Sequence, residues 1–188
     1  MRQNGDIFAG DYLRQGSPTN TTRQESVPRW HATANIAIAA TGVVHTSAIP
    51  LQAGDLVGAI TFVTGTTAAG TPTAGYLALR SPAGVVLAQS ADLGSTARAA
   101  NTAFKIAMAT AYLVPTAGLY LVDISFTATT VPSLIGAAAQ NAVIAGVVVT
   151  GMPILAQTHG SAVGAAPPAT IATPTTVATL PYYVITES

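Results

Sequence analysis

The chain has 188 residues, and its seven Lys plus Arg balance seven Asp plus Glu, so its formal charge is zero. Only 7% of the residues are charged, against about 25% in an ordinary soluble protein. This excludes a nucleic-acid binder, which needs a basic surface to neutralise phosphates. Cysteine is absent, which excludes disulfides, thiolate catalysis and Cys-based zinc sites.

Residues 1–30 differ in composition from the rest of the chain. Gly, Pro, Asn and Thr punctuate them, and they carry four of the seven basic groups. We predict an extended N-terminal arm over 1–30, without a core of its own, followed by a single β-sandwich domain over 31–188. Its candidate contacts with partner proteins are Arg14, Arg23, Arg29 and Trp30. Trp30, the only Trp, is expected to anchor the first strand in the core, and the alternative is a contact with a neighbouring subunit.

From residue 31 to about residue 130, apolar residues alternate with a period of two, which predicts half-buried strands. The segment 118–128, "GLYLVDISFTA", places Tyr120, Val122, Ile124 and Phe126 on one face. Its other face carries Asp123, which we expect to point outward and to pair with Arg80 or Lys105. Similar alternation occurs at Ile36 and Ile38; Leu56, Ile60 and Phe62; Leu77 and Leu79; Val85 and Leu87; and Phe104, Ile106 and Met108.

Turn sequences separate these strands, as at "SPAG" (81–84) and "PTAG" (115–118). Strands that recur about every ten residues indicate an all-β fold, an antiparallel β-sandwich of jelly-roll-like type. The uncharged stretch "TFVTGTTAAGTPTAGYLAL" (61–79) begins and ends like a strand. We therefore interpret its middle as an ordered loop inside one sandwich, and not as a joint between two domains.

The last third of the chain, 136–188, has a less regular pattern. The segment 133–157 is uncharged and long enough to span a bilayer, but Gln140, Asn141 and Pro153 interrupt it, so no membrane contact is expected. We predict a strand buried on both faces at "AVIAGVVV" (142–149). A long Pro/Gly/Thr-rich loop over 157–176 and a terminal strand at "LPYYVITE" (180–187) follow.

Few residues suggest catalysis. The carboxylates of the predicted domain are scattered, and His31, His45 and His159 lack the spacing of a helical metal site, although a sheet can still bring His31 and His45 together. No phosphate-binding or nucleophile motif is present. We therefore expect no enzyme activity, no cofactor and no metal.

The segment Ile49–Leu134 resembles a group of virion structural proteins of tailed phages of actinobacteria, labelled minor tail or minor structural proteins. The shared phrases are "ITFVTGTTAAGTPT", "GYLALRSPAG", "VLAQSAD", "AANTA", "YLVPTAGLYLV" and "ATTVPSL". The resemblance implies a non-enzymatic capsid-decoration, minor capsid or minor tail component. Such a protein is made in the host cytoplasm and located at the surface of the phage particle. Its partners would be other virion proteins, such as major capsid or tail proteins, and further copies of itself, with a trimer favoured.

The sequence departs from this group at two places. Where such proteins often have aromatic residues, this chain has Ala74, Gly75 and Ala97, with only Tyr76 aromatic. The alternative function is a jelly-roll module that binds host cell-wall glycan, for which Tyr76, Tyr112 and Tyr182 are the candidate contacts. A hydrolase that depends on Asp123 is a third hypothesis, and the few acids and histidines disfavour it.

Overall fold

The computed structural model describes residues 23–138, 142–150 and 153–187, and these are almost entirely β-structure. The largest sheet has the strand order β11-β10-β3-β8-β5-β6. Its strands are β3 (Val44–Leu51), β5 (Gly70–Arg80), β6 (Val86–Gln89), β8 (Gly118–Thr130), β10 (Ala156–His159) and β11 (Thr175–Thr176). A second sheet, β1-β13-β4-β7, contains β1 (Arg23–Glu25), β4 (Leu56–Val63), β7 (Ala103–Leu113) and β13 (Tyr183–Thr186). A third, β12-β9-β2, contains β2 (Ala34–Ile36), β9 (Leu134–Ala138) and β12 (Thr179–Pro181).

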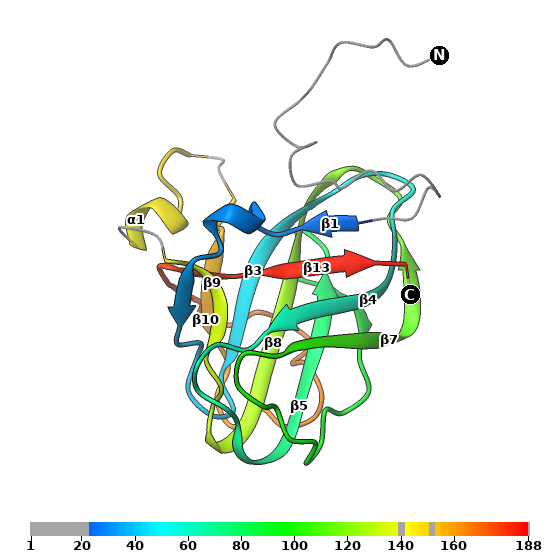
Figure 1. Ribbon diagram of the computed structural model, residues 1–188. Helices are drawn as coiled ribbons and strands as arrows, with labels where there is room; N and C mark the ends of the chain where they lie inside the picture. Colours follow the sequence, from blue (N-terminus) through cyan, green and yellow to red (C-terminus); the bar gives the residue numbers. More distant parts are fainter. Residues whose placement is uncertain (1–22, 139–141, 151–152, 188) are drawn as a thin grey trace.

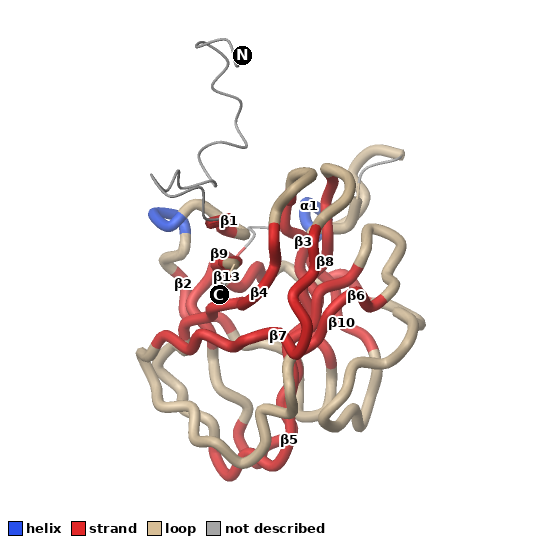
Figure 2. The backbone as a smooth tube through the Cα atoms, turned by 90° about the vertical axis from the view of Figure 1, so that its right-hand side faces the viewer, coloured by secondary structure: helices blue, strands red, loops and turns tan. Residues whose placement is uncertain are grey.

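The two larger sheets form the two layers of the molecule. Their strands run crosswise, with β13, β4 and β7 lying over β3, β8 and β5 (Figure 1), as in orthogonally packed sandwiches. Figure 2 shows β4 and β13 on one side of the fold and β3, β8 and β10 on the other. Every strand pair within these sheets is antiparallel. The predicted all-β sandwich is confirmed.

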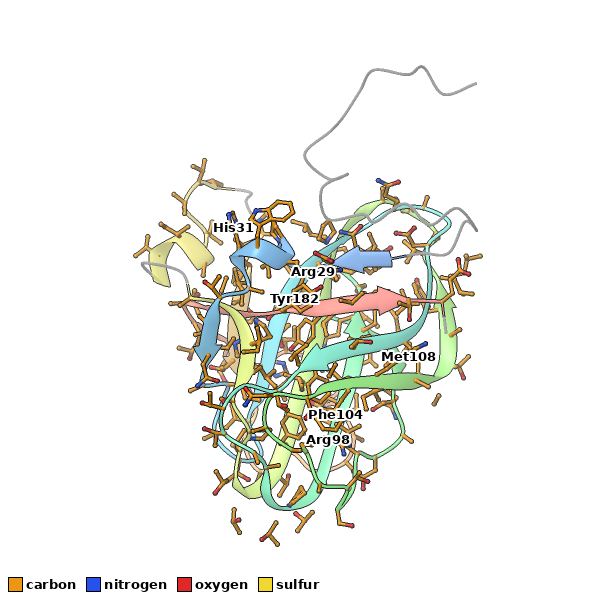
Figure 3. The ribbon with its side chains drawn as sticks, in the orientation of Figure 1. Arg29, His31, Arg98, Phe104, Met108 and Tyr182 are labelled. Carbon is orange, nitrogen blue, oxygen red and sulfur yellow. The ribbon has the colours of Figure 1, made fainter. Side chains whose placement is uncertain are left out.

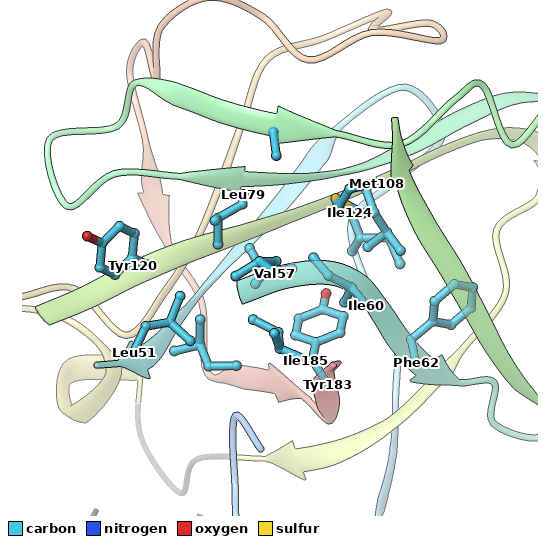
Figure 4. Packing of buried hydrophobic residues seen from close by; sticks show 14 of the residues in the cluster. Leu51, Val57, Ile60, Phe62, Leu79, Met108, Tyr120, Ile124, Tyr183 and Ile185 are labelled. Carbon is cyan, nitrogen blue, oxygen red and sulfur yellow. The ribbon is translucent and has the colours of Figure 1, made fainter. Parts of the chain in front are cut away.

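The hydrophobic core fills the space between the two layers (Figure 4). Tyr120, Val122, Ile124 and Phe126 of β8 are all buried in it, as the alternation predicted. The ring of Phe62 lies 5.5 Å from that of Phe104 and 5.9 Å from that of Phe126, centroid to centroid. Each large apolar side chain that is fully buried contributes about 1.5–3 kcal/mol, so this layer supplies most of the driving force for folding.

An irregularity in the pairing of β4 with β7 changes which β4 residues face the core. Val57 pairs with Tyr112 but Ala59 pairs with Ala107, so one residue of β4 lies opposite four residues of β7, and an irregularity of this kind interrupts the alternation of faces along the strand. As a result Val57 is fully buried and Leu56 is only half-buried. The expectation that Leu56 shares a face with Ile60 and Phe62 is wrong for this reason.

The predicted boundary between the arm and the folded domain, after residue 30, is too far along the chain. Residues 23–25 form β1, which pairs with β13, and Gln24 and Glu25 are buried. A 3-10 helix, η2 (Arg29–His31), follows. The first 22 residues of the predicted arm lie outside the described residues. Trp30 does not anchor the core, because it is 61% exposed on η2.

The C-terminal third differs from its prediction at one place and follows it at two. The segment 142–149 is not a buried strand: α1 (Ala142–Ala145) is a short helix, and Val143, Ile144, Val147, Val148 and Val149 are all more than half exposed. The predicted long loop is confirmed over 160–174, between β10 and β11. The predicted terminal strand is also present, divided into β12 and β13, which belong to different sheets.

The loop 64–69 carries the chain from β4 in one sheet to β5 in the other. The amide of Gly65 donates to the carbonyl of Ser133, and the amide of Thr67 donates to the Ser133 hydroxyl. The Asn35 side chain accepts from the amide of Thr66 and donates to its hydroxyl. The loop is therefore ordered, as predicted, and it connects the two layers.

We expect Gly65→Ala to destabilise the fold. A Cβ at residue 65 would lie 1.7 Å from the Asn35 Oδ1 atom and 2.7 Å from the Ser133 hydroxyl, so it would displace both anchors of the loop. The expected loss is about 1–3 kcal/mol, measured by thermal or urea unfolding. Gly164→Ala is the matched control, because nothing lies within 4 Å of its Cβ position. Equal stability of the two variants would contradict this account of the loop.

Candidate functional site

The face of the six-stranded sheet that points away from the core is covered by the loop 160–174, named here the covering loop. The Thr127 hydroxyl donates to the carbonyl of Val163, and Val163 packs against Val44 and Tyr76. Asp123 and Ser125 lie on this face and are buried. Asp123 therefore does not point outward, and that prediction is wrong because the covering loop replaces solvent on this side of β8.

A buried ion pair lies beneath the covering loop. Arg80 Nε donates to Asp123 Oδ2 at 2.5 Å, and both side chains are 0% exposed. The other two guanidinium nitrogens donate to the carbonyls of Gly84 and Pro168, each at 2.8 Å. One side chain thus joins β8, the β5–β6 turn and the covering loop. Of the two predicted partners of Asp123, Arg80 is confirmed and Lys105, which is exposed, is wrong.

The second oxygen of Asp123 begins a chain of hydrogen bonds. The Thr46 hydroxyl donates to Asp123 Oδ1 at 2.6 Å, and Nε2 of His159 lies 3.1 Å from the same hydroxyl. A hydroxyl has one proton to donate, so Nε2 of His159 must carry a proton and donate it to Thr46. Within the described residues, Nδ1 of His159 is buried without a hydrogen-bond partner.

This arrangement does not resemble a working hydrolytic site. A general base needs its acceptor nitrogen within hydrogen-bond reach of a substrate or nucleophile, whereas Nδ1 of His159 is sealed from solvent. Both oxygens of Asp123 are already engaged, by Arg80 and by Thr46. The contacts are those of a structural network that fixes the covering loop. Among the described residues, no group of three His, Cys, Asp or Glu side chains could hold a metal ion.

His45 lies on the core-facing side of β3, away from His31. Its Nε2 is 3.1 Å from the Thr179 hydroxyl, and its Nδ1 is 3.3 Å from the Ser47 hydroxyl. Burial lowers its pKa to about 4, against the opposing effects of the Thr179 hydrogen bond and the Asp123 charge. Burial also raises the pKa of Tyr76 and of Tyr183, whose hydroxyls have no partner within the described residues.

A second polar network joins β1 to the segment between β12 and β13. Arg29 Nη2 lies 2.7 Å from Glu25 Oε1, and the Tyr182 hydroxyl donates to the same oxygen at 3.0 Å. Figure 3 shows Arg29, on η2, next to Tyr182. The Ser26 hydroxyl donates to the carbonyl of Pro181. Glu25 and Ser26 therefore belong to the folded body.

The predicted contact residues do not come together in one site. Arg14 lies outside the described residues, and of Arg23 only the strand pairing is described. Tyr76 is fully buried, Tyr182 is 7% exposed, and Tyr112 is half-buried against the core. The prediction that Tyr76 and Tyr182 contact glycan is wrong, because a sugar needs an exposed ring face. Trp30 is exposed, and its ring makes an edge contact with His31.

The stretch 142–149, which was predicted to be a buried strand, contributes apolar surface instead. The five exposed residues of 143–149 lie at the same end of the molecule as η2 (Figures 1 and 2). A pocket of about 610 Å³ opens between the β5–β6 turn, the start of β8 and the covering loop. A smaller pocket of about 390 Å³ is lined by residues of β10 and of the covering loop, among them His159, Pro168 and Thr170. The only sequence signal for this surface is the lack of charge in 133–157.

The sequence matches no family model and no curated protein. Among the helices of the described residues, none is long and apolar enough to cross a membrane.

We expect Asp123→Asn to destabilise the protein by about 3–5 kcal/mol, because it leaves the buried Arg80 charge without its counter-charge. Urea unfolding measures this loss. Asp92→Asn is the matched control: Asp92 is exposed, and an Asn oxygen can still accept from the amides of Gly75 and Gly94. Arg80→Met combined with Asp123→Asn should cost less than the two single changes added together. Wild-type stability of Asp123→Asn would contradict the structural role of the pair.

His45 should make the protein sensitive to mild acid. Well above pH 6.5 the ring is neutral in both states and adds no pH dependence. As pH falls from about 6.5 to about 4, the unfolded chain binds a proton that the folded chain cannot, so stability falls. The loss reaches about 3 kcal/mol and then levels off. Unfolding free energy measured from pH 7 to pH 4 should have a smaller slope in His45→Gln than in wild type, whereas His31→Gln, at an exposed site, should keep the wild-type slope.

Proposed function

We propose that this chain is a non-enzymatic structural protein of a bacteriophage virion, a capsid-decoration, minor capsid or minor tail component. The observation that carries the proposal is that the described part of the chain has a surface nearly without charge. Of the ten charged residues in the described part of the chain, Glu25, Asp55, Arg80, Arg98 and Asp123 are buried. Only Arg29, Asp92, Lys105 and Glu187 have described side chains that reach the surface.

A surface of this kind is suited to burial in an assembly. Free proteins remain dispersed largely through net charge, whereas repeated contacts between subunits remove apolar surface from water. The exposed apolar residues at the α1 end supply such surface. The partners proposed are other virion proteins and further copies of the chain, with a trimer favoured, and the location proposed is the surface of the particle.

The resemblance to minor structural proteins of tailed phages adds support. The segment that carries it, 49–134, runs from β3 to the start of β9. It therefore contains the strands that build most of the core. A glycan-binding module is less well supported, because two of its three candidate tyrosines are buried.

Truncations can test the role of the N-terminal segment in incorporation. We expect deletion of 1–22 to leave a folded body, because β1 and the Glu25–Arg29 contact remain. We also expect this truncated protein no longer to enter particles, because the deleted segment is proposed to bind other virion proteins. Deletion of 1–29 should also lower the melting temperature, since it removes β1. Particles purified from host cells expressing each variant are analysed for the protein, and electron microscopy with labelled full-length protein distinguishes head from tail. Absence of the full-length protein from particles would refute the proposed function, and normal incorporation of the shorter truncation would refute the role of the segment.

A further inference from the structure

Two uncharged apolar features lie on the surface of this molecule. The first, named here the apolar segment, is 142–150, where Val143, Ile144, Val147, Val148 and Val149 are 52–65% exposed. Together these side chains expose on the order of 400 Å² of apolar surface, the size of patch that marks an interaction site on a monomer. The segment lies within a stretch of the sequence that has no charged residue from 124 to 186.

The second feature is the apolar pocket of about 610 Å³. Pro82 and Val85 of the β5–β6 turn, Leu119 and Leu121 of β8, Ile154, and Ile171 of the covering loop contribute its apolar walls. Val85 is 58% exposed. None of the described residues that line the pocket is charged, and its volume is in the range that accommodates small apolar groups.

The apolar segment does not fill the pocket of its own chain. The amide of Leu155 donates to the carbonyl of Ala145 at 2.7 Å, and the position of Gly146 is next to Thr176 of β11. These contacts hold the segment toward β11 and leave its side chains in solvent. The pocket wall formed by Pro153 and Ile154 follows the segment in the chain. Among the described residues, the apolar segment and the pocket are therefore both at the surface, and the segment does not occupy the pocket.

We propose that the apolar segment of one copy inserts into the apolar pocket of a second copy. The two surfaces match in charge, since neither carries any, so the contact buries apolar groups without desolvating an ion. A contact between two different surfaces of the same chain is heterologous, and it closes into a ring or continues as a filament. This inference specifies the self-association within the proposed function, and it can fail while that function stands.

The proposed contact is small. The segment and the pocket walls together bury an area at or below the low end of stable interfaces, about 1,200 Å² in total. We therefore expect wild-type association at micromolar concentrations and above, seen by sedimentation velocity as a species larger than the monomer. A wild-type protein that remains monomeric at millimolar concentration would overturn the inference.

Complementation between two variants tests the contact directly. Val148→Asp places a charge on the apolar segment, and Val85→Asp places one at the pocket; both positions are more than half exposed, so both variants should fold, which circular dichroism checks. Each variant alone should be monomeric, with self-association weakened at least tenfold. An equimolar mixture should form dimers and nothing larger, because each pair retains one intact segment and one intact pocket. Leu113→Asp, at a residue that is 62% exposed and belongs to neither surface, should associate as wild type does.

Three results would overturn the inference. If the mixture stays monomeric, the contact is not between two different surfaces. If Val148→Asp still associates and Val85→Asp does not, another segment occupies the pocket. If both variants associate as wild type does, neither surface is involved. Particle incorporation of the full-length protein is measured separately, so failure of the proposed function is distinguishable from failure of this contact.

Discussion

The buried ion pair between Arg80 and Asp123 is the constraint on which the outer half of the fold depends. A charge taken out of water is tolerated only when its counter-charge and its remaining hydrogen bonds are in place. Asp123 is satisfied by two neighbouring strands, β5 and β3, and Arg80 needs two further carbonyls from Gly84 and Pro168. The covering loop therefore shields the pair and also completes its hydrogen bonds. A loop rich in Pro, Gly and Thr can do this because its exposed backbone supplies acceptors without a regular strand.

The alternation of apolar residues made the strands and the core predictable, but it did not reveal that the covering loop packs on the outer face of the six-stranded sheet. Apolar alternation identified Tyr120, Val122, Ile124 and Phe126 as core residues, and they are buried. The same alternation made Asp123 look solvent-facing. A polar residue that faces water and one that faces a buried polar network have the same sequence pattern, and the distinction depends on a loop that contacts β8 from more than 30 residues away. The short β1 was missed because three residues show no periodicity and its partner lies at the other end of the described chain.

The candidate site was less predictable than the fold for a related reason. Side-chain chemistry alone suggested that Tyr76 and Tyr182 present their rings to a sugar and that Trp30 anchors the core. In the structure the two tyrosines are buried and Trp30 is exposed. Whether an aromatic residue is buried depends on the covering loop, for Tyr76, and on β1 with its Glu25 carboxylate, for Tyr182. No pattern in the sequence predicts which strand or side chain either element contacts. The uncharged stretch around 142–149 was assigned to the core because apolar composition does not reveal whether a neighbouring element is present to cover it.

The position of β13 has a consequence for how the chain reaches this structure. It lies between β1 and β4, so the four-stranded sheet is incomplete until residues 183–186 insert beside strands more than a hundred residues earlier in the chain. Pairings between such distant residues make folding slow. Until that step, the edge of β4 and the side chains of Ile60 and Phe62 are open to other chains. Any delay in the insertion of β13 would therefore prolong this exposure and favour aggregation over native closure.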